Sequence, residues 1–192
     1  MKMRLHLFST ILFGLAFFAA TAAAQTVSWK QIVGIIPAGN VVGSGTGAVT
    51  GGFLPWTTTE GAARVDVRDG RIQFVVRGLV FAGGAPGITI GTPAPVTAVN
   101  GTLVCDVDGS AGGGNSVLVQ TPSVRLTSTG DAFFSGRVGP LPSVCKTQAD
   151  MAFLIRVTAF GSTTTSSGPW IANGAVLVRG DDMDRDRDGD GH

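Results

Sequence analysis

Residues 63–76 read ARVDVRDGRIQFVV, and this stretch decides the fold class. Apolar and charged side chains alternate up to Arg68, which is the period of a half-buried β-strand. Asp69-Gly70 follows as a two-residue turn, because Asp-Gly suits the left-handed dihedral angles of a type I′ turn. Residues 71–81 then return as a second, longer strand. The stretch therefore predicts an antiparallel β-hairpin.

The same rhythm of short β-branched and aromatic runs between Gly, Pro, Asn and Asp continues along the chain. It predicts further strands at residues 26–36, 96–105, 116–120, 123–128, 132–138, 151–160 and 170–178. Thr129-Gly130-Asp131 is predicted to be a second hairpin turn, and segments 43–52 and 161–168, rich in glycine or Ser/Thr, are predicted to be flexible loops. No helical apolar period separates these strands. We therefore predict an all-β fold, an antiparallel two-sheet sandwich, with a small closed β-barrel as the alternative.

The N-terminal residues predict export. Lys2 and Arg4 precede an apolar run at residues 7–20, and Ala22-Ala23-Ala24 supplies the small residues of a cleavage site. This is the pattern of a cleaved secretory signal, too short and wrongly flanked for a membrane anchor. We predict a signal peptide at residues 1–24, a single β-sandwich domain at 25–180, no transmembrane segment after cleavage, and a secreted or periplasmic location.

Cys105 and Cys145 are the two cysteines of the chain. An isolated pair in an exported protein indicates a disulfide. A zinc pair fits poorly, because zinc needs four ligands and no further cysteine or histidine partner is at hand.

Composition excludes several classes of function. The net charge is +1, and charged residues make up 14% of the chain without a Lys/Arg cluster, so nucleic-acid binding is not expected. His6 lies in the signal peptide and His192 is the last residue, so the folded body has no histidine for triad, acid/base or metal chemistry. No cofactor is expected. We predict a non-enzymatic binding or structural module of the cell envelope or extracellular space, of unknown ligand, working through loops such as 43–52 and 161–168.

An enzyme that uses carboxylates alone, acting on a glycan, is the alternative. It would need two acidic side chains facing each other across a cleft. Several acidic residues lie at predicted turns, where aspartate is favoured for turn chemistry alone. The candidates are Glu60, Asp66, Asp69, Asp106, Asp108, Asp131 and Asp150.

The composition changes at residue 181, where DDMDRDRDGDGH begins. This segment has one apolar residue and is predicted to be an acidic, disordered tail. Asp186, Asp188 and Asp190 match the opening half of an EF-hand calcium loop, with Gly191 at its sharp turn. The twelfth-position acid is missing, so the sequence predicts at most weak calcium binding.

Four segments resemble a group of exported bacterial proteins without an assigned function. They are VNGTLVC at 99–105, GDAFFSG at 130–136, AFLIR at 152–156 and WIANGA at 170–175. The resemblance implies a disulfide-bearing β domain and brings no active-site residues. The strand-and-glycine rhythm is also similar to CHRD-type β domains, but the chain lacks the histidine motif associated with them, so that assignment is not carried over.

Overall fold

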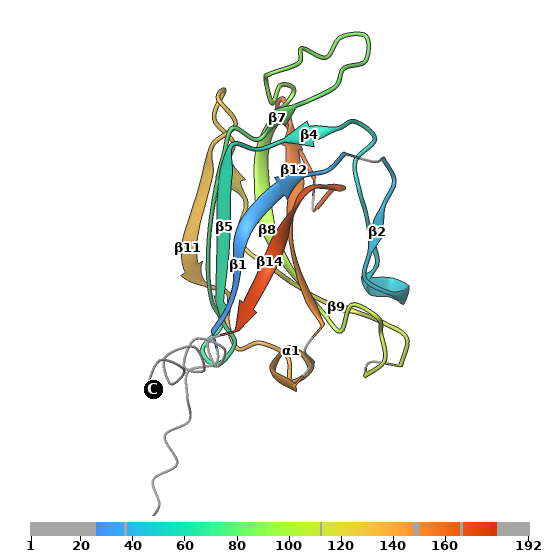
Figure 1. Cartoon of the computed structure of the whole chain (residues 1–192), viewed down its shortest axis with the longest axis vertical. Helices are drawn as coiled ribbons and strands as arrows, with labels where there is room; N and C mark the ends of the chain where they lie inside the picture. The colour runs from blue at the N-terminus through green and yellow to red at the C-terminus, as the bar shows by residue number, and fades with distance from the viewer. Residues whose placement is uncertain (1–25, 37, 112, 148–149, 166, 180–192) are drawn as a thin grey trace, which may run out of the picture.

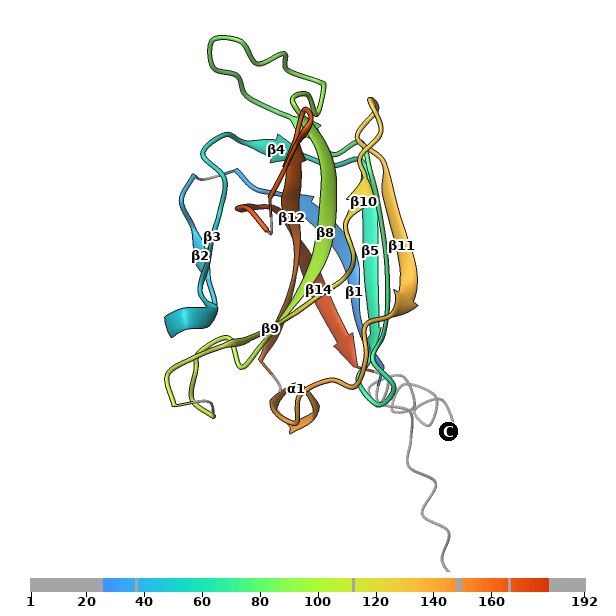
Figure 2. The same ribbon diagram turned by 180° about the vertical axis from the view of Figure 1, so that it is seen from behind.

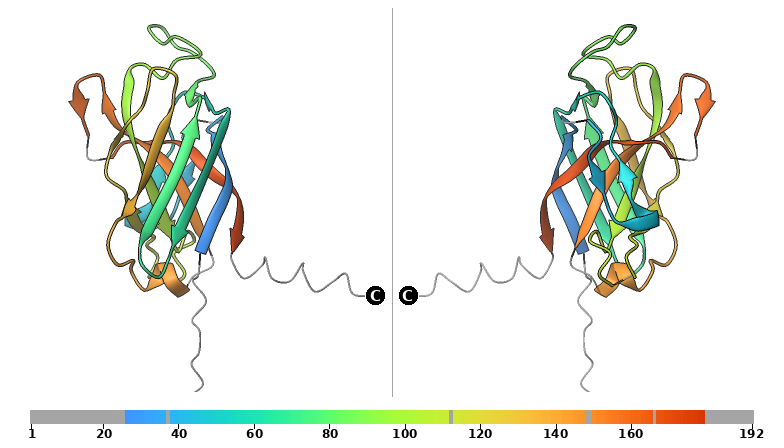
Figure 3. Two further views of the ribbon diagram at one scale, coloured as in Figure 1. Left: turned by 90° about the vertical axis from the view of Figure 1, so that its left-hand side faces the viewer. Right: turned by 90° about the vertical axis from the view of Figure 1, so that its right-hand side faces the viewer.

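The computed structural model describes residues 26–36, 38–111, 113–147, 150–165 and 167–179. Within them the fold is all-β and antiparallel, as predicted, and its main sheet curls strongly (Figures 1 and 3). The predicted signal peptide and the acidic tail with Asp186, Asp188 and Asp190 lie outside the described residues. The helices among the described residues are too short to cross a membrane.

Ten strands form the main sheet, and eight of them follow the order β10-β8-β12-β14-β1-β5-β6-β11, with β9 beside β8 and β13 beside β12. The bounds are β1 Thr26–Gly34, β5 Glu60–Asp66, β6 Arg71–Arg77, β8 Val96–Cys105, β9 Val117–Gln120, β10 Val124–Arg125, β11 Ala132–Arg137, β12 Met151–Phe160, β13 Thr163–Thr164 and β14 Trp170–Arg179. Two small two-stranded pairs complete the fold, namely β2 Val41–Val42 with β3 Val49–Thr50, and β4 Trp56–Thr57 with β7 Val80–Phe81.

Aromatic side chains fill the inside of the curl. The ring of Phe153 on β12 lies 5.5 Å from that of Trp29 on β1 and 5.9 Å from that of Phe74 on β6, between centroids. Gly101 on β8 makes room for this contact, because a Cβ atom there would lie 2.6 Å from Phe153 and 2.9 Å from Phe74. One curled sheet therefore supplies both of the packed layers that the sandwich prediction assigned to two sheets.

The two edges of the curled sheet meet at a turn. Strands β10 and β11 are edge strands, lie against each other and are joined directly by residues 126–131 (Figure 2). The turn is also attached to the break between β6 and β7, since the Leu79 N–H donates to the Gly130 carbonyl at 2.8 Å. The Gly78 N–H donates to Asp131 Oδ1 at 3.0 Å. The predicted turn at 129–131 thus connects the two edges of the curled sheet and is hydrogen-bonded to the segment between β6 and β7.

The structure corrects some local predictions. The last β5–β6 pair is Asp66 with Arg71, so the loop has four residues rather than the two of the Asp69-Gly70 prediction. The Asp66 carboxylate accepts the Arg68 N–H at 3.0 Å, which favours this longer turn. The predicted strand 71–81 breaks at Gly78, whose φ is +60°.

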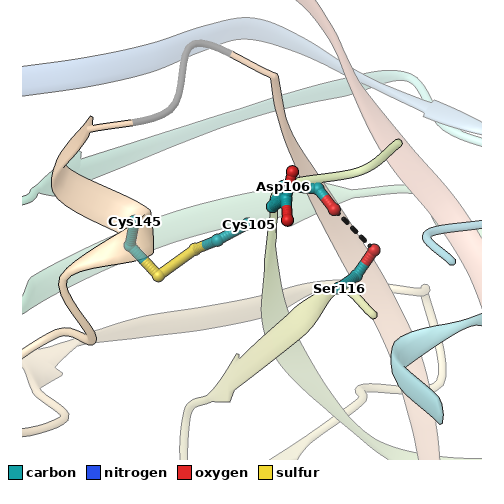
Figure 4. Close-up of a disulfide and its surroundings, with 4 residues drawn as sticks. All are labelled: Cys105, Asp106, Ser116 and Cys145. Carbon is teal, nitrogen blue, oxygen red and sulfur yellow. Dashed lines mark hydrogen bonds between the residues drawn. A yellow bond between two sulfur atoms is a disulfide. The ribbon is translucent and has the colours of Figure 1, made fainter. Parts of the chain in front are cut away.

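Segments predicted to lack regular structure contain some. The glycine-rich segment 43–52 includes a short 3₁₀ helix, Gly45–Gly47, and strand β3. A four-residue helix, α1 Val144–Thr147, follows β11. It carries Cys145, which forms the predicted disulfide with Cys105 at the end of β8 (Figure 4).

Removing the disulfide should destabilise the protein strongly. The bond closes a loop of 40 residues, which the chain-entropy model values at about 4 kcal/mol. We expect Cys145→Ala to lower the free energy of unfolding by about that amount, measured by guanidinium denaturation. Reductant should shift the midpoint of the parent protein and leave that of the variant unchanged. An unchanged free energy of unfolding in the variant would contradict this expectation.

The Asp131 carboxylate should make the stability of the turn at 129–131 depend on pH. The Thr129 hydroxyl and the Gly78 N–H lower the pKa of Asp131 below its ordinary 3.8. The stabilisation is therefore present above the unfolded pKa and is lost as the pH falls through the folded pKa.

We expect Asp131→Asn to lower the melting temperature at neutral pH, with the difference from the parent disappearing at about pH 2. Calorimetry across this pH range would measure it. Asp131→Ala, which also removes the acceptor oxygens, should leave a difference even in acid. A gap between parent and Asp131→Asn that is the same at every pH would show that the charge of Asp131 has no role.

Candidate functional site

The most unusual charged residue of the described chain is Arg156. It lies in the middle of β12, between β8 and β14, and only 9% of its surface is exposed. Its side chain leaves the strand toward the segment that follows β13, where Nε donates to the Gly168 carbonyl at 2.9 Å and Nη2 to the Ser167 carbonyl at 3.1 Å. Arginine is rarely buried to this extent without an acidic partner.

Arg156 has no such partner among the described residues. The ion pairs found there are Arg77 with Glu60 and Arg137 with Asp69, both at the surface. Burial lowers the pKa of Arg156, since desolvation disfavours its charged form. A guanidinium nevertheless stays protonated in proteins, so a positive charge is retained at this position.

Part of the guanidinium remains available for a ligand. Nη1 of Arg156 makes no hydrogen bond to a described residue. Every fully buried side-chain nitrogen or oxygen of the described residues does have a partner, so Nη1 keeps contact with solvent. Its N–H groups can therefore donate to an incoming acceptor without first breaking a protein hydrogen bond.

A cavity of about 310 Å³ lies beside this side chain. It is bounded by two segments that the sequence analysis singled out as loops. Its lining residues are Ala48, Val49, Thr50, Gly51, Phe53, Arg156, Ser167, Gly168 and Pro169. The structure thus brings segments 43–52 and 161–168, far apart in the sequence, to the same charged residue.

The first of these segments is held firmly on the sheet. The Ser44 N–H donates to Ser116 Oγ at 2.7 Å, and the Thr46 N–H donates to Asn115 Oδ1 at 2.8 Å. Gly47 packs so closely on the Ser116 carbonyl that no side chain fits there. The indole N–H of Trp170 donates to the Asn40 carbonyl at 3.2 Å. These contacts fix the wall of the cavity that carries Thr50 and Gly51.

The second segment is held by two amide side chains, the buried Asn100 and the exposed Gln120. Ser167 Oγ donates to Gln120 Oε1 at 2.7 Å, and Asn100 Nδ2 approaches Ser167 Oγ at 3.3 Å. Asn100 is 3% exposed and is paired with Arg156 in the β8–β12 register. The Ser167 carbonyl that accepts from Arg156 is therefore itself positioned, which is the arrangement expected of a preorganised site.

Three of the candidate carboxylates come together elsewhere. Oxygens of Asp106, Asp108 and Asp150 lie within 4.8 Å of one another. Asp106 lies next to the disulfide (Figure 4). The Asp108 N–H donates to Asp150 Oδ2 at 3.1 Å. The Ser110 N–H donates to Asp108 Oδ1 and lowers the pKa of Asp108. Such oxygens are of the kind that calcium binds.

The buried member of this acidic cluster is already engaged. Asp106 has no exposed surface, and the Ala111 N–H lies 3.1 Å from both of its carboxylate oxygens. Ser116 Oγ donates to the Asp106 carbonyl at 2.7 Å (Figure 4). A carboxyl group without exposed surface cannot reach a glycan, so the Asp106 side chain does not supply half of the catalytic pair that the alternative requires.

The remaining candidate carboxylates are in turns or in surface pairs. Asp69 and Asp131 lie in turns, as predicted, and accept backbone N–H groups. Asp66, predicted to lie on the polar face of the hairpin, ends β5 and accepts the Arg68 N–H. The Arg137 guanidinium holds the pKa of Asp69 below its usual value. Glu60 lies in a surface ion pair with Arg77. None of these residues lines the cavity beside Arg156.

Sequence reasoning missed Arg156. It is the one charged residue in the strand MAFLIRVTAF, and that isolation in an apolar run was the available signal. No protein-family model, curated protein or solved structure matches the chain. The resemblance to exported bacterial proteins therefore stays a prediction, and the site must be interpreted from its own geometry.

Proposed function

We propose that the protein is an exported binding module that holds an anionic group on Arg156. The observation that carries this proposal is a buried guanidinium that faces a cavity and has no carboxylate partner among the described residues. The two segments that bound the cavity supply backbone and small side chains, which allow a ligand to approach closely. The disulfide is in keeping with the oxidising, secreted or periplasmic location that the N-terminal sequence predicts.

The energetics favour an anion at this position. Desolvating an ion costs several kcal/mol, even after the protein relaxes. Two hydrogen bonds to carbonyls offset roughly 1.5–3 kcal/mol each, but they supply no counter-charge for the guanidinium. A carboxylate or phosphate that bonds to Nη1 would supply a charge-assisted hydrogen bond and a neutralising charge at once.

The lining of the cavity selects against cations. None of its residues is acidic, and Arg156 supplies its single charge. A small oxyanion with no other contact should bind with a Kd of about 1 mM, equivalent to roughly −4 kcal/mol. Larger ligands would add contacts with the two segments.

Titration with sodium acetate and sodium phosphate tests the proposal. We expect the Nε–H resonance of Arg156 in ¹H–¹⁵N spectra to shift saturably with either anion, and not with sodium chloride at equal ionic strength. Arg156→Gln should abolish the saturable response of neighbouring amides. Arg125→Gln, which removes the same charge from an exposed position, should leave it unchanged.

A second variant keeps the test valid if Arg156→Gln does not fold. Thr50 is exposed and lines the cavity, so Thr50→Glu places a carboxylate within it. We expect this variant to keep its melting temperature and to lose anion binding, because its own carboxylate occupies Arg156. Thr57→Glu, an exposed change on β4, is the matched control. Full anion binding by Thr50→Glu, or none by the parent protein, would overturn the proposal.

A further inference from the structure

A second cavity adjoins the one beside Arg156, and the two share a wall. This second cavity has a volume of about 180 Å³. Phe53 and Pro169 line both cavities. The two are therefore neighbouring compartments on either side of these two side chains.

The second cavity, called here the apolar compartment, has a very different character from the first. Its deep wall contains Trp56 and Phe81, whose ring centroids are 4.0 Å apart, together with Val157 and Ile171. All of its lining residues are apolar, aromatic, glycine or proline. A cavity of about 150 Å³ lined by such side chains holds one benzene molecule. The apolar compartment therefore has room for one aromatic ring or one short branched chain.

The two cavities are lined by consecutive residues at two places in the chain. On β12, Arg156 lines the first cavity, called here the charged compartment, and the next residue, Val157, lines the apolar compartment. Gly51 and Gly52 divide in the same way. Because Phe53 and Pro169 line both compartments, a ligand that fills both must carry its anion close to its apolar group.

The α-carboxylate and side chain of an amino-acid residue have this separation. A free amino acid would also bring an ammonium group, and neither compartment has an acidic residue to receive it. The C-terminal residue of a peptide has the carboxylate and the side chain without the ammonium. Capture of a terminal carboxylate is a known mode of peptide recognition.

Exposed aromatic surface at the entrance extends the site beyond a single residue. Phe53 is 84% exposed and Phe160 40% exposed, and both line the apolar compartment. Apolar surface of this kind, next to a pocket, is typical of a protein or peptide interaction site. It would contact the residues that precede the C-terminal one.

We infer that the site binds the C-terminus of a polypeptide that ends in an aromatic or branched aliphatic residue, with the carboxylate on Arg156 and the last side chain in the apolar compartment. This inference rests on the proposed function, because it uses the same arginine. It adds the class of partner and a preference for the last residue.

Calorimetric titration with short peptides tests the inference. We expect N-acetyl-Gly-Gly-Phe to bind at least tenfold more tightly than N-acetyl-Gly-Gly-Gly, as burial of one aromatic ring predicts. The C-terminal amide of the first peptide should bind at least tenfold more weakly than the acid. Free phenylalanine should bind more weakly than the acetylated peptide, because its ammonium has no partner.

A cavity-filling variant separates this inference from the proposed function. A Cβ atom at Gly52 would lie 3.5 Å from Ile171, an ordinary contact, so a side chain fits there. Gly52→Leu should fill the apolar compartment and abolish the preference for phenylalanine over glycine, while acetate still binds to Arg156. Gly52→Ala, the matched control, should keep most of the preference.

Each other outcome is also decisive. Equal binding of the phenylalanine and glycine peptides, with acetate still bound, would overturn the inference and leave the proposed function standing. Equal binding of the acid and the amide would overturn the role of the carboxylate. Tighter binding of sodium decanoate than of the peptide would identify an acyl chain as the partner and overturn the peptide. No binding of any anion would overturn both proposals.

Discussion

The fold depends on a close contact across the inside of the curled sheet. The ring of Phe153 reaches Phe74 on the opposite wall because Gly101, beside both, has no side chain. A methyl group at that position would meet both rings at less than 3 Å, and packed cores tolerate such insertions poorly. Such an insertion would strain the two walls that the turn at 126–131 joins. The close aromatic contact therefore requires glycine at position 101.

The curvature in turn positions the candidate site. Strand β12 lies between β8 and β14, and all of its residues except Ala152 and Phe160 are buried. A charge placed there must be compensated by main-chain carbonyls, by buried amides or by a ligand. The carbonyls of Ser167 and Gly168 do part of this, and Asn100 and Gln120 fix the segment that carries them. The remaining N–H groups face a cavity, which is why the site is interpreted as a place for an anion.

Local pattern predicted most of the strands and little of the site. The alternation in ARVDVRDG locates a half-buried strand by its period of two. The β-branched runs at 96–105 and 151–160 locate strands that are buried along most of their length. The disulfide was also predicted correctly, because the chain has two cysteines and an export signal is predicted. That β10 and β11, which follow each other in the chain, are the two edges of one curled sheet depends on the pairing of β1 with β14 and of β8 with β12. These strands are far apart in the sequence, so the arrangement could not be predicted.

The candidate site shows the same division between local and distant information. Segments 43–52 and 161–168 were singled out as binding loops, but nothing in their sequences says that they meet at Arg156. Asp150 likewise joins Asp106 and Asp108 only through the pairing of Met151 with Cys105. The length of the Asp69-Gly70 turn was mispredicted because the side chain of Asp66, three residues before Asp69, accepts the Arg68 and Asp69 N–H groups. Arg156 and Asp150 each depend on contacts with residues distant in the sequence, which are known only from the tertiary structure.

The alternation of compartments along β12 has a consequence for how this protein can vary between related sequences. Substitutions in the glycine-rich segments alter the shape of either compartment separately. An insertion or deletion of one residue within β12 would instead exchange the side chains at positions 156 and 157, since a one-residue shift turns every side chain to the other face. The arginine side chain would then enter the apolar compartment, and a valine would line the charged compartment in place of the guanidinium. In the proposed mode of binding, recognition depends on the length of β12, so homologues that bind in this way should conserve the number of residues in β12 more strictly than their identity.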